Sequence, residues 1–352
     1  MKNFGAYNDG LLAQKRMDGD LPADLFTADV FDDPGKKKSL YAWLNSFKNN
    51  SDFSQIPDLF SACPFINNAN QIPIWADKKQ MKRGSAFFVS HAKTIMELLG
   101  LLSLPYCYAA ANGAMVLYLS NRMKVDVGKR LFETAEFVWD VMSPEAFEST
   151  GRGFASILKV RLMHAAARYY VLKSGRWYNE WGFPVNQEDM AGTNLSFSLI
   201  AVRGLRKLGI TVSYDEQQAF IHLWNVIGYL LGLDEHLLPR NGNEAFNLEE
   251  SIRVRQFRKS EQGMALTSSL INYFCAMDNQ NRFSGEEILK LMRYLLGDSA
   301  ADIIGLPVSR LSLSKLQLLK AINSLNLDNT TENATITYKK KRREFRKNKH
   351  IV

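Results

Sequence analysis

The most constraining feature of the sequence is a helical spacing of apolar residues that recurs from about residue 81 to residue 327. Apolar side chains return every three or four residues, which places them on one face of a helix. The segments with this spacing are Gly84–Leu102, Lys129–Met142, Phe154–Ser174, Leu195–Leu208, Ser213–Leu231 and Glu261–Phe274. Strand-like alternation is almost absent, and no repeat of fixed period is found. The sequence therefore predicts an all-α fold with a single large helical domain over residues 81–327.

The two ends of the chain have a different character. Residues 1–80 are rich in Pro, Gly, Asn and Asp, which predicts an arm of short helices and loops. Residues 328–352 are polar and then strongly basic, which predicts a disordered basic tail. The net charge is +8, and residues 339–349 alone carry eight basic residues and one acid. Because the rest of the chain is nearly neutral, we expect no dedicated nucleic-acid-binding domain, only a tail able to touch an anionic membrane or nucleic acid non-specifically.

The compartment is predicted from the cysteines and the first residues. Three cysteines lie far apart and form no CxxC pair, and the opening residues lack the apolar core of a signal peptide. These features predict a cytoplasmic protein. The uncharged segment Leu98–Leu119 contains Pro105 and several small or polar residues. We interpret it as a buried pair of helices broken near Pro105 rather than as a transmembrane helix.

One histidine has neighbours suited to cofactor chemistry. On a helix, Arg161, His164 and Arg168 share one face, and three alanines follow the histidine. Small side chains beside an imidazole would admit a flat group, and two arginines could pair with its carboxylates, as a haem with an axial histidine requires. The alternative is a structural histidine between two surface arginines.

A second group of residues shares a helix face with the spacing i, i+3 and i+4. These residues are Arg130, Glu133 and Thr134. Spacing alone favours an ordinary surface ion pair between Arg130 and Glu133. The sequence contains no E-x-x-H pair, no H-E-x-x-H, no Walker A loop and no G-x-S-x-G, so di-iron, zinc-protease, nucleotide-dependent and hydrolase chemistries are weakly indicated.

The aromatic segment 177–189 ends in polar residues that precede a predicted helix. Asn186, Gln187 and Asp189 could cap this helix, or the segment could orient the helix that carries His164.

Six short pieces in order carry a family resemblance between about residues 70 and 275. They are IWAD at 74–77 with RG at 83–84, RLFET at 130–134, VRLMHAAAR at 160–168, WGFPVNQED at 181–189 with Thr193, Trp224, and LG at 231–232 with LP at 238–239. On these pieces the chain resembles the haem-dependent oxygenase family of the mycophenolic-acid-pathway oxygenase and latex clearing protein, a rubber oxygenase.

The resemblance implies an all-helical fold with a globin-like core and a non-covalently bound b-type haem. It makes His164 the proximal iron ligand and places Arg130 and Thr134 near the haem, with Arg161 and Arg168 as further candidates to bind it. It also implies O2 as co-substrate and an unsaturated apolar, isoprenoid or lipid-like substrate whose carbon–carbon double bond is cleaved.

Two departures from the rubber oxygenase bear on activity. The distal lysine of that enzyme is matched here by Glu133, and the helix that carries its distal glutamate, Leu104–Met123 here, has no carboxylate. Glu133 would then either act as a base near the iron or pair with Arg130. We therefore expect a haem b-dependent oxygenase. The alternatives are a non-enzymatic haem or lipid carrier of the same fold and a cofactor-free helical scaffold.

Overall fold

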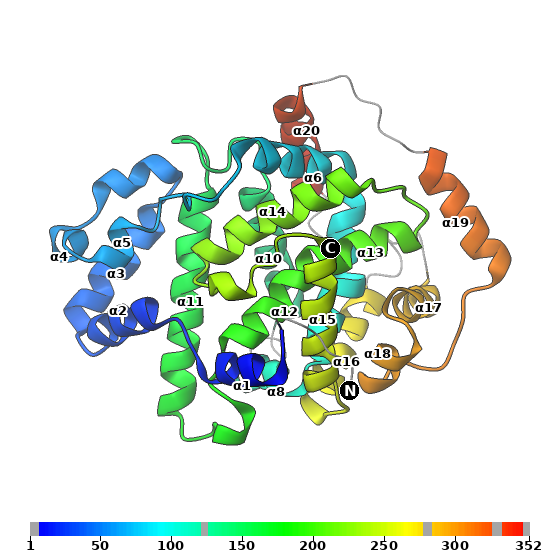
Figure 1. Cartoon of the computed structure of the whole chain (residues 1–352), viewed down its shortest axis with the longest axis horizontal. Helices are drawn as coiled ribbons and strands as arrows, with labels where there is room; N and C mark the ends of the chain where they lie inside the picture. The colour runs from blue at the N-terminus through cyan, green and yellow to red at the C-terminus, as the bar shows by residue number, and fades with distance from the viewer. Residues whose placement is uncertain (1–6, 121–125, 277–283, 326–332, 348–352) are drawn as a thin grey trace.

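The protein is helical throughout the residues that the structure, a computed structural model, describes: 7–120, 126–276, 284–325 and 333–347 (Figure 1). No strand is present in these ranges, and the only β-type pairing found there is an isolated bridge between Ala110 and Phe257. The predicted all-α class is confirmed. The globin-like character of the core stays a prediction.

Two long helices cross at the centre of the core. These are α6 (Lys78–Leu98) and α14 (Tyr214–Leu230), which begin at the side-chain caps Asp77 and Ser213. Their backbones approach closely at Gly84, where an added Cβ would lie 2.5 Å from the carbonyl oxygen of Ala219. A residue without a side chain is needed there, because any Cβ would collide with a backbone atom that cannot move freely.

Further helices surround this pair and close the core. In chain order they are η2 (Leu99–Ser103), α7 (Leu104–Tyr108), α8 (Ala111–Leu119), α10 (Val127–Val141), α11 (Gly153–Lys173), η3 (Asn179–Trp181), α12 (Gln187–Phe197), α13 (Leu199–Lys207), η4 (Glu235–Leu237), α15 (Gly242–Gln256), α16 (Glu261–Ala276), α17 (Gly285–Leu296), α18 (Asp298–Ile303) and α19 (Leu313–Leu325).

The N-terminal segment is a lobe of short helices that is continuous with the main core. It comprises α1 (Asp9–Met17), α2 (Leu21–Phe31), α3 (Pro34–Ser46), η1 (Asn50–Gln55), α4 (Asp58–Ser61) and α5 (Pro64–Asn67). Helix α2 packs along α11, and the lobe projects to one side of the molecule (Figure 1). Trp43, Phe60 and Ile66 of this lobe are buried in the same apolar cluster as α6 and α14, so the lobe and the helical domain share one core.

The uncharged segment begins within a helical run that reaches Tyr108. The run Lys78–Tyr108 is long and apolar enough to cross a membrane by length and mean hydropathy, yet 61% of its most apolar window is buried in the protein. The expected helix pair is present as α7 and α8, but the chain breaks at Ala109 and Ala110 rather than near Pro105. Pro105 is tolerated because it lies in the first turn of α7, directly after the π-helical turn η2.

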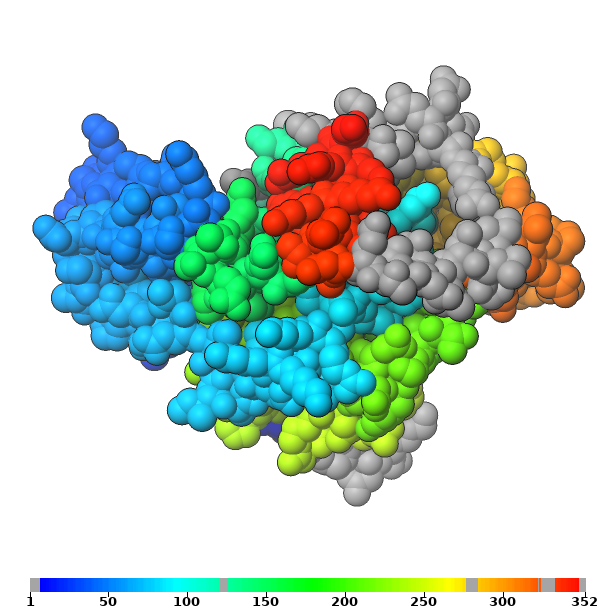
Figure 2. All heavy atoms as spheres, turned by 90° about the horizontal axis from the view of Figure 1, so that it is seen from above, coloured from blue at the N-terminus to red at the C-terminus, as the bar shows by residue number. Residues whose placement is uncertain are grey.

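The basic tail is where the structure corrects the sequence prediction. Residues 334–347 form helix α20 (Ala334–Lys347), which lies beside α6 on the surface (Figure 2). Tyr338 is buried, and Arg342 and Arg346 form ion pairs with Glu136 of α10. The disordered tail was predicted from its density of basic residues. That prediction did not include Glu136 and Asp140, which lie far away in the chain and pair with Arg342 and Arg346. The predicted contact with an anionic membrane or nucleic acid assumed a free tail and has no support here.

The α6–α14 crossing gives a stability prediction. Gly84→Ala should lower the free energy of unfolding by about 1–3 kcal/mol, because the new methyl group overpacks the backbone contact at Ala219. The matched control is Gly192→Ala in α12, where the new Cβ meets Ile252 at an ordinary 3.4 Å; it should be neutral or stabilising by up to about 1 kcal/mol. Urea unfolding curves measure both, and equal effects would contradict the close crossing.

Candidate functional site

His164 lies in the middle of α11 and is half-buried. Its Nδ1 atom is buried and has no hydrogen-bond partner. Burial is the main cause that lowers the pKa of His164 from 6.5 to about 4; the positive charges of Arg168 and Arg130 contribute to the decrease, and Asp20 opposes it. The imidazole is therefore neutral at pH 7, which is the form that binds a metal ion. Several other buried side-chain atoms among the described residues also have no partner, including the indole nitrogens of Trp43 and Trp139, so the unpartnered Nδ1 atom is compatible with a ligand role for His164 but does not distinguish it.

Arg130 of α10 is the first residue of the RLFET segment, one of the pieces that carry the family resemblance. It is half-buried, and its charge acts both on His164 of α11 and on Tyr108 at the end of α7. Burial raises the pKa of Tyr108, and Arg130 opposes this rise, so the phenol is protonated at neutral pH. Helices α10 and α11 pack directly against each other. Arg130 therefore lies within electrostatic reach of both His164 and Tyr108. Spacing could not single out Tyr108, and the grouping of Arg130 with His164 in one functional site stays a prediction.

The two other residues of the Arg130 group lie in different surroundings. Thr134 is half-buried, and its hydroxyl donates to the carbonyl oxygen of Arg130 at 3.0 Å, a bond within its own helix. Glu133 is exposed on the surface of α10. Its exposure gives Glu133 none of the burial that would increase the proton affinity of a catalytic base, and its role as a base stays a prediction.

The role predicted for the two arginines that flank His164 has to be corrected. Arg161 donates from Nε and Nη2 to both carboxylate oxygens of Asp20, at 2.6 and 2.8 Å. Arg168 donates from Nε to Asp24 at 2.5 Å and from Nη1 to the carbonyl oxygen of Val185 at 3.2 Å. Both acids belong to the start of α2, outside the segment in which the sequence predicted the site. Arg161 and Arg168 therefore hold α2 against α11, and we do not assign them to the carboxylates of a cofactor.

The segment before α12 both caps its own helix and contacts α11. Asn186 is the N-cap, and its side-chain oxygen accepts from the backbone N–H of Asp189 at 2.9 Å. The carbonyl oxygen of Val185 accepts from Arg168, and Val185 has a φ of +49°, which is strained for a β-branched residue. The segment therefore does both things: Asn186 caps α12, and the carbonyl oxygen of Val185 binds Arg168 of α11.

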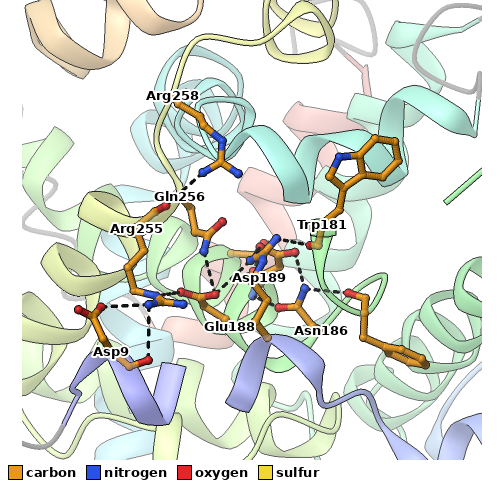
Figure 3. Close-up of polar contacts among 11 residues, drawn as sticks. Asp9, Trp181, Asn186, Glu188, Asp189, Arg255, Gln256 and Arg258 are labelled. Atoms are coloured by element: carbon orange, nitrogen blue, oxygen red, sulfur yellow. Dashed lines mark hydrogen bonds and ion pairs between the residues drawn. The ribbon is translucent and has the colours of Figure 1, made fainter. Parts of the chain in front are cut away.

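A buried charge network fixes α12 to the N-terminal helix α1, and sequence reasoning missed it. Glu188 is fully buried and accepts from Arg16 at 3.1 Å, from Arg255 at 2.7 Å and from Gln256 at 2.9 Å (Figure 3). Arg16 also donates to Asp189 at 3.0 Å. Asp189 in turn lies against Gly113 of α8. No spacing rule could reveal this network, because Arg16 and Glu188, which it joins, lie 172 residues apart in the chain.

Among the described residues, no three His, Cys, Asp or Glu side chains gather into a metal-binding cluster. His164 is thus a single candidate ligand, in a surrounding that supplies positive charge from Arg130.

Comparisons with known proteins give the family of the chain. The family model described as the catalytic domain of the ER-bound oxygenase mpaB/B′ and rubber oxygenase matches residues 82–321. The chain belongs to this family. It is 26% identical over 245 residues to the rubber oxygenase of Streptomyces sp. (strain K30), a match that covers 69% of this chain and 60% of that protein. The chain thus matches less than two thirds of the length of that relative.

A solved structure extends the similarity in fold beyond the family region. The structure titled latex clearing protein LCP in the closed state aligns with a TM-score of 0.77 at 23% identity, covering 93% of this chain and 90% of that one. His164, Arg130 and Thr134 lie inside the region matched to the oxygenase family, whereas Asp20, Asp24 and α20 lie outside it. The catalytic-domain match therefore contains the candidate ligand but not the carboxylates that hold its helix.

The neutral state of His164 gives a pH prediction for the protein without cofactor. Between pH 6.5 and pH 4 the unfolded histidine gains a proton and the folded one does not, so the free energy of unfolding should fall as the pH drops through this interval. The contribution is about 3 kcal/mol when complete. Urea unfolding at several pH values should show this loss in the wild type but not in His164→Gln, whereas His236→Gln, at an exposed position, should behave like the wild type. Equal pH dependence in wild type and His164→Gln would contradict a buried neutral imidazole.

Proposed function

We propose that this protein is a haem b-dependent oxygenase that acts with O2 on an unsaturated, apolar, polyisoprene-like substrate. The observation that carries the proposal is His164, a neutral histidine with an unpartnered buried nitrogen, next to Arg130 inside the region matched to the oxygenase catalytic domain. The relative that shares this region is a rubber oxygenase, which supports the substrate class.

The residues present fit a haem in part. His164 supplies a neutral nitrogen ligand, and the buried Ala165 next to it takes up little space on the helix. Arg130 places a positive charge within electrostatic reach of His164 that would favour a carboxylate of the cofactor, whereas Arg161 and Arg168 are bound to Asp20 and Asp24. Haem, when bound, would supply the iron at which O2 is activated.

The surrounding residues have definable roles in such a site. Tyr108 carries its proton at neutral pH and can donate a hydrogen bond, but it cannot accept a proton as a base. Arg130 keeps a positive charge near the site and favours anionic groups there. The buried apolar side chains of Leu131, Ala135 and Leu162 exclude water from the α10–α11 contact.

The second candidate function is a haem or lipid carrier without oxygenase activity. Two observations about the acids favour it. Glu133 is exposed, and Asp20, whose charge acts on His164, is paired with Arg161. A carrier needs the ligand and the apolar surroundings but no base.

The cofactor is tested by expressing the chain with a haem precursor and recording the absorption spectrum and the pyridine haemochrome. We expect near one-to-one b-type haem in the wild type and its loss in His164→Ala, because the ligand is removed. The exposed His236→Ala should keep its haem. A His164→Ala protein that retains a full Soret band would overturn the ligand assignment, and a wild type that takes up no hemin would overturn the cofactor.

Oxygen uptake separates the two candidate functions. The haem-loaded protein should consume O2 with oligomers of isoprene and not with their saturated analogues, because only the former carry the double bond to be cleaved. A protein that holds haem but consumes no O2 with any member of this panel is a carrier.

A further inference from the structure

Helix α20 covers one face of α10, the helix that carries Arg130. Phe345 stacks on Phe132 with ring centroids 5.7 Å apart and nearly parallel planes, and it also contacts Trp139. The Tyr338 hydroxyl donates to the carbonyl oxygen of Trp139 at 2.5 Å. At 100° per residue, Phe132, Glu136 and Trp139 form a face of α10 opposite to the face of Arg130 and Thr134. Helix α10 therefore lies between α20 and the candidate site.

Arg342 is the charged centre of this contact. Its Nη2 donates to Glu136 at 2.8 Å and also to Asp140, and its Nη1 donates to the Tyr338 hydroxyl at 2.9 Å. The side chains of Arg342 and Asp140 are only 13% and 5% exposed. Glu136 and Asp140 are one helical turn apart on the same side of α10, and Arg342 pairs with both of them. Glu136 also pairs with Arg346, and Asp140 also pairs with Arg152.

The contact continues from α10 into α11. Asp140 accepts a hydrogen bond from the hydroxyl of Ser156 at 2.6 Å. Ser156 lies on α11, about two turns before His164. A single chain of polar contacts thus runs from Arg342 through Asp140 to Ser156 and joins α20 to both helices that present the site.

We propose that Arg342 is a positioning residue for the candidate site, acting through Glu136 and Asp140 to hold α10 against α11. This inference rests on the proposed function for its consequence, since it assigns to α20 the task of keeping Arg130 and His164 in register. Helix α20 lies outside the region matched to the oxygenase catalytic domain, so the positioning contact joins that region to a segment beyond it.

The charges around Glu136 indicate that Arg342 joins α20 to α10 and is not an ordinary exposed surface arginine. Burial disfavours the Glu136 carboxylate, yet the hydrogen bonds from Arg346 and Arg342 outweigh burial and lower the pKa of Glu136. Arg343, on the outer face of the same helix, is exposed and provides a matched position where the same charge is removed without the contact.

The test uses the full chain and measures the chemical accessibility of His164. The cofactor-free protein is treated with diethyl pyrocarbonate at pH 7, and modification of the His164 peptide is followed by mass spectrometry. Arg342→Gln should speed this modification by about tenfold, since it weakens a largely buried ion pair between two helices. Arg342→Lys should lie in between, because a lysine keeps the charge without the planar fork. Arg343→Gln should match the wild type.

A second variant guards against loss of folding. Arg342→Gln combined with Glu136→Gln removes the Glu136 carboxylate together with the guanidinium, but it still leaves α20 without the ion pairs of Arg342. This variant too should speed the modification of His164. In the haem-loaded protein, the Soret maximum of Arg342→Gln should shift while that of Arg343→Gln should not.

An unchanged His164 modification rate in a folded Arg342 variant would overturn the positioning role. This holds whether or not haem binds. A wild type that takes up no hemin would refute the proposed function alone, because the modification rate still decides whether Arg342 holds the two helices together.

Discussion

The charged contacts along α11 decide where its histidine lies. Near the C-terminal half of this helix, Arg161 and Arg168 are paired with Asp20 and Asp24 of α2. Nearer its N-terminus, Ser156 donates to Asp140 of α10. Ion pairs with little exposure gain little net free energy over apolar packing, but removing one partner is costly, and so they favour a single arrangement of the helices. His164 lies between Arg161 and Arg168 and about two turns after Ser156.

This arrangement gives His164 its chemical character. With one nitrogen buried and unpartnered and with two arginines within electrostatic reach, the imidazole is held neutral. The nearest structural acid, Asp20, cannot offset this because it is shared with Arg161. The same ion pairs that position the helix therefore also keep the lone pair of the imidazole available. Arg161 and Arg168 hold α2 against α11, and the charge of Arg130 acts on His164 from α10.

The parts of the chain outside the matched catalytic region support the site from two sides. The N-terminal lobe supplies Asp20 and Asp24, and α20 supplies Arg342. The network around Glu188 performs a similar function for α12, where Arg16 and Arg255 enclose one buried carboxylate (Figure 3). In each case a long-range pair of opposite charges joins elements that are far apart in the chain. The oxygenase-like core is thus enclosed by contacts that its own segment does not contain.

The sequence by itself determined the fold class, the helix caps and the identity of the central residues. Helical spacing depends only on neighbours three or four residues apart, and the predicted cap Asn186 acts within one turn. His164 and Arg130 were recognisable because short segments preserve a family pattern. The partners of Arg161 and Arg168, the helical state of the tail and the exposure of Glu133 were decided only by the tertiary structure. Each depends on contacts between residues that are distant in the chain or on the side of a helix that faces solvent, and local spacing contains neither kind of information.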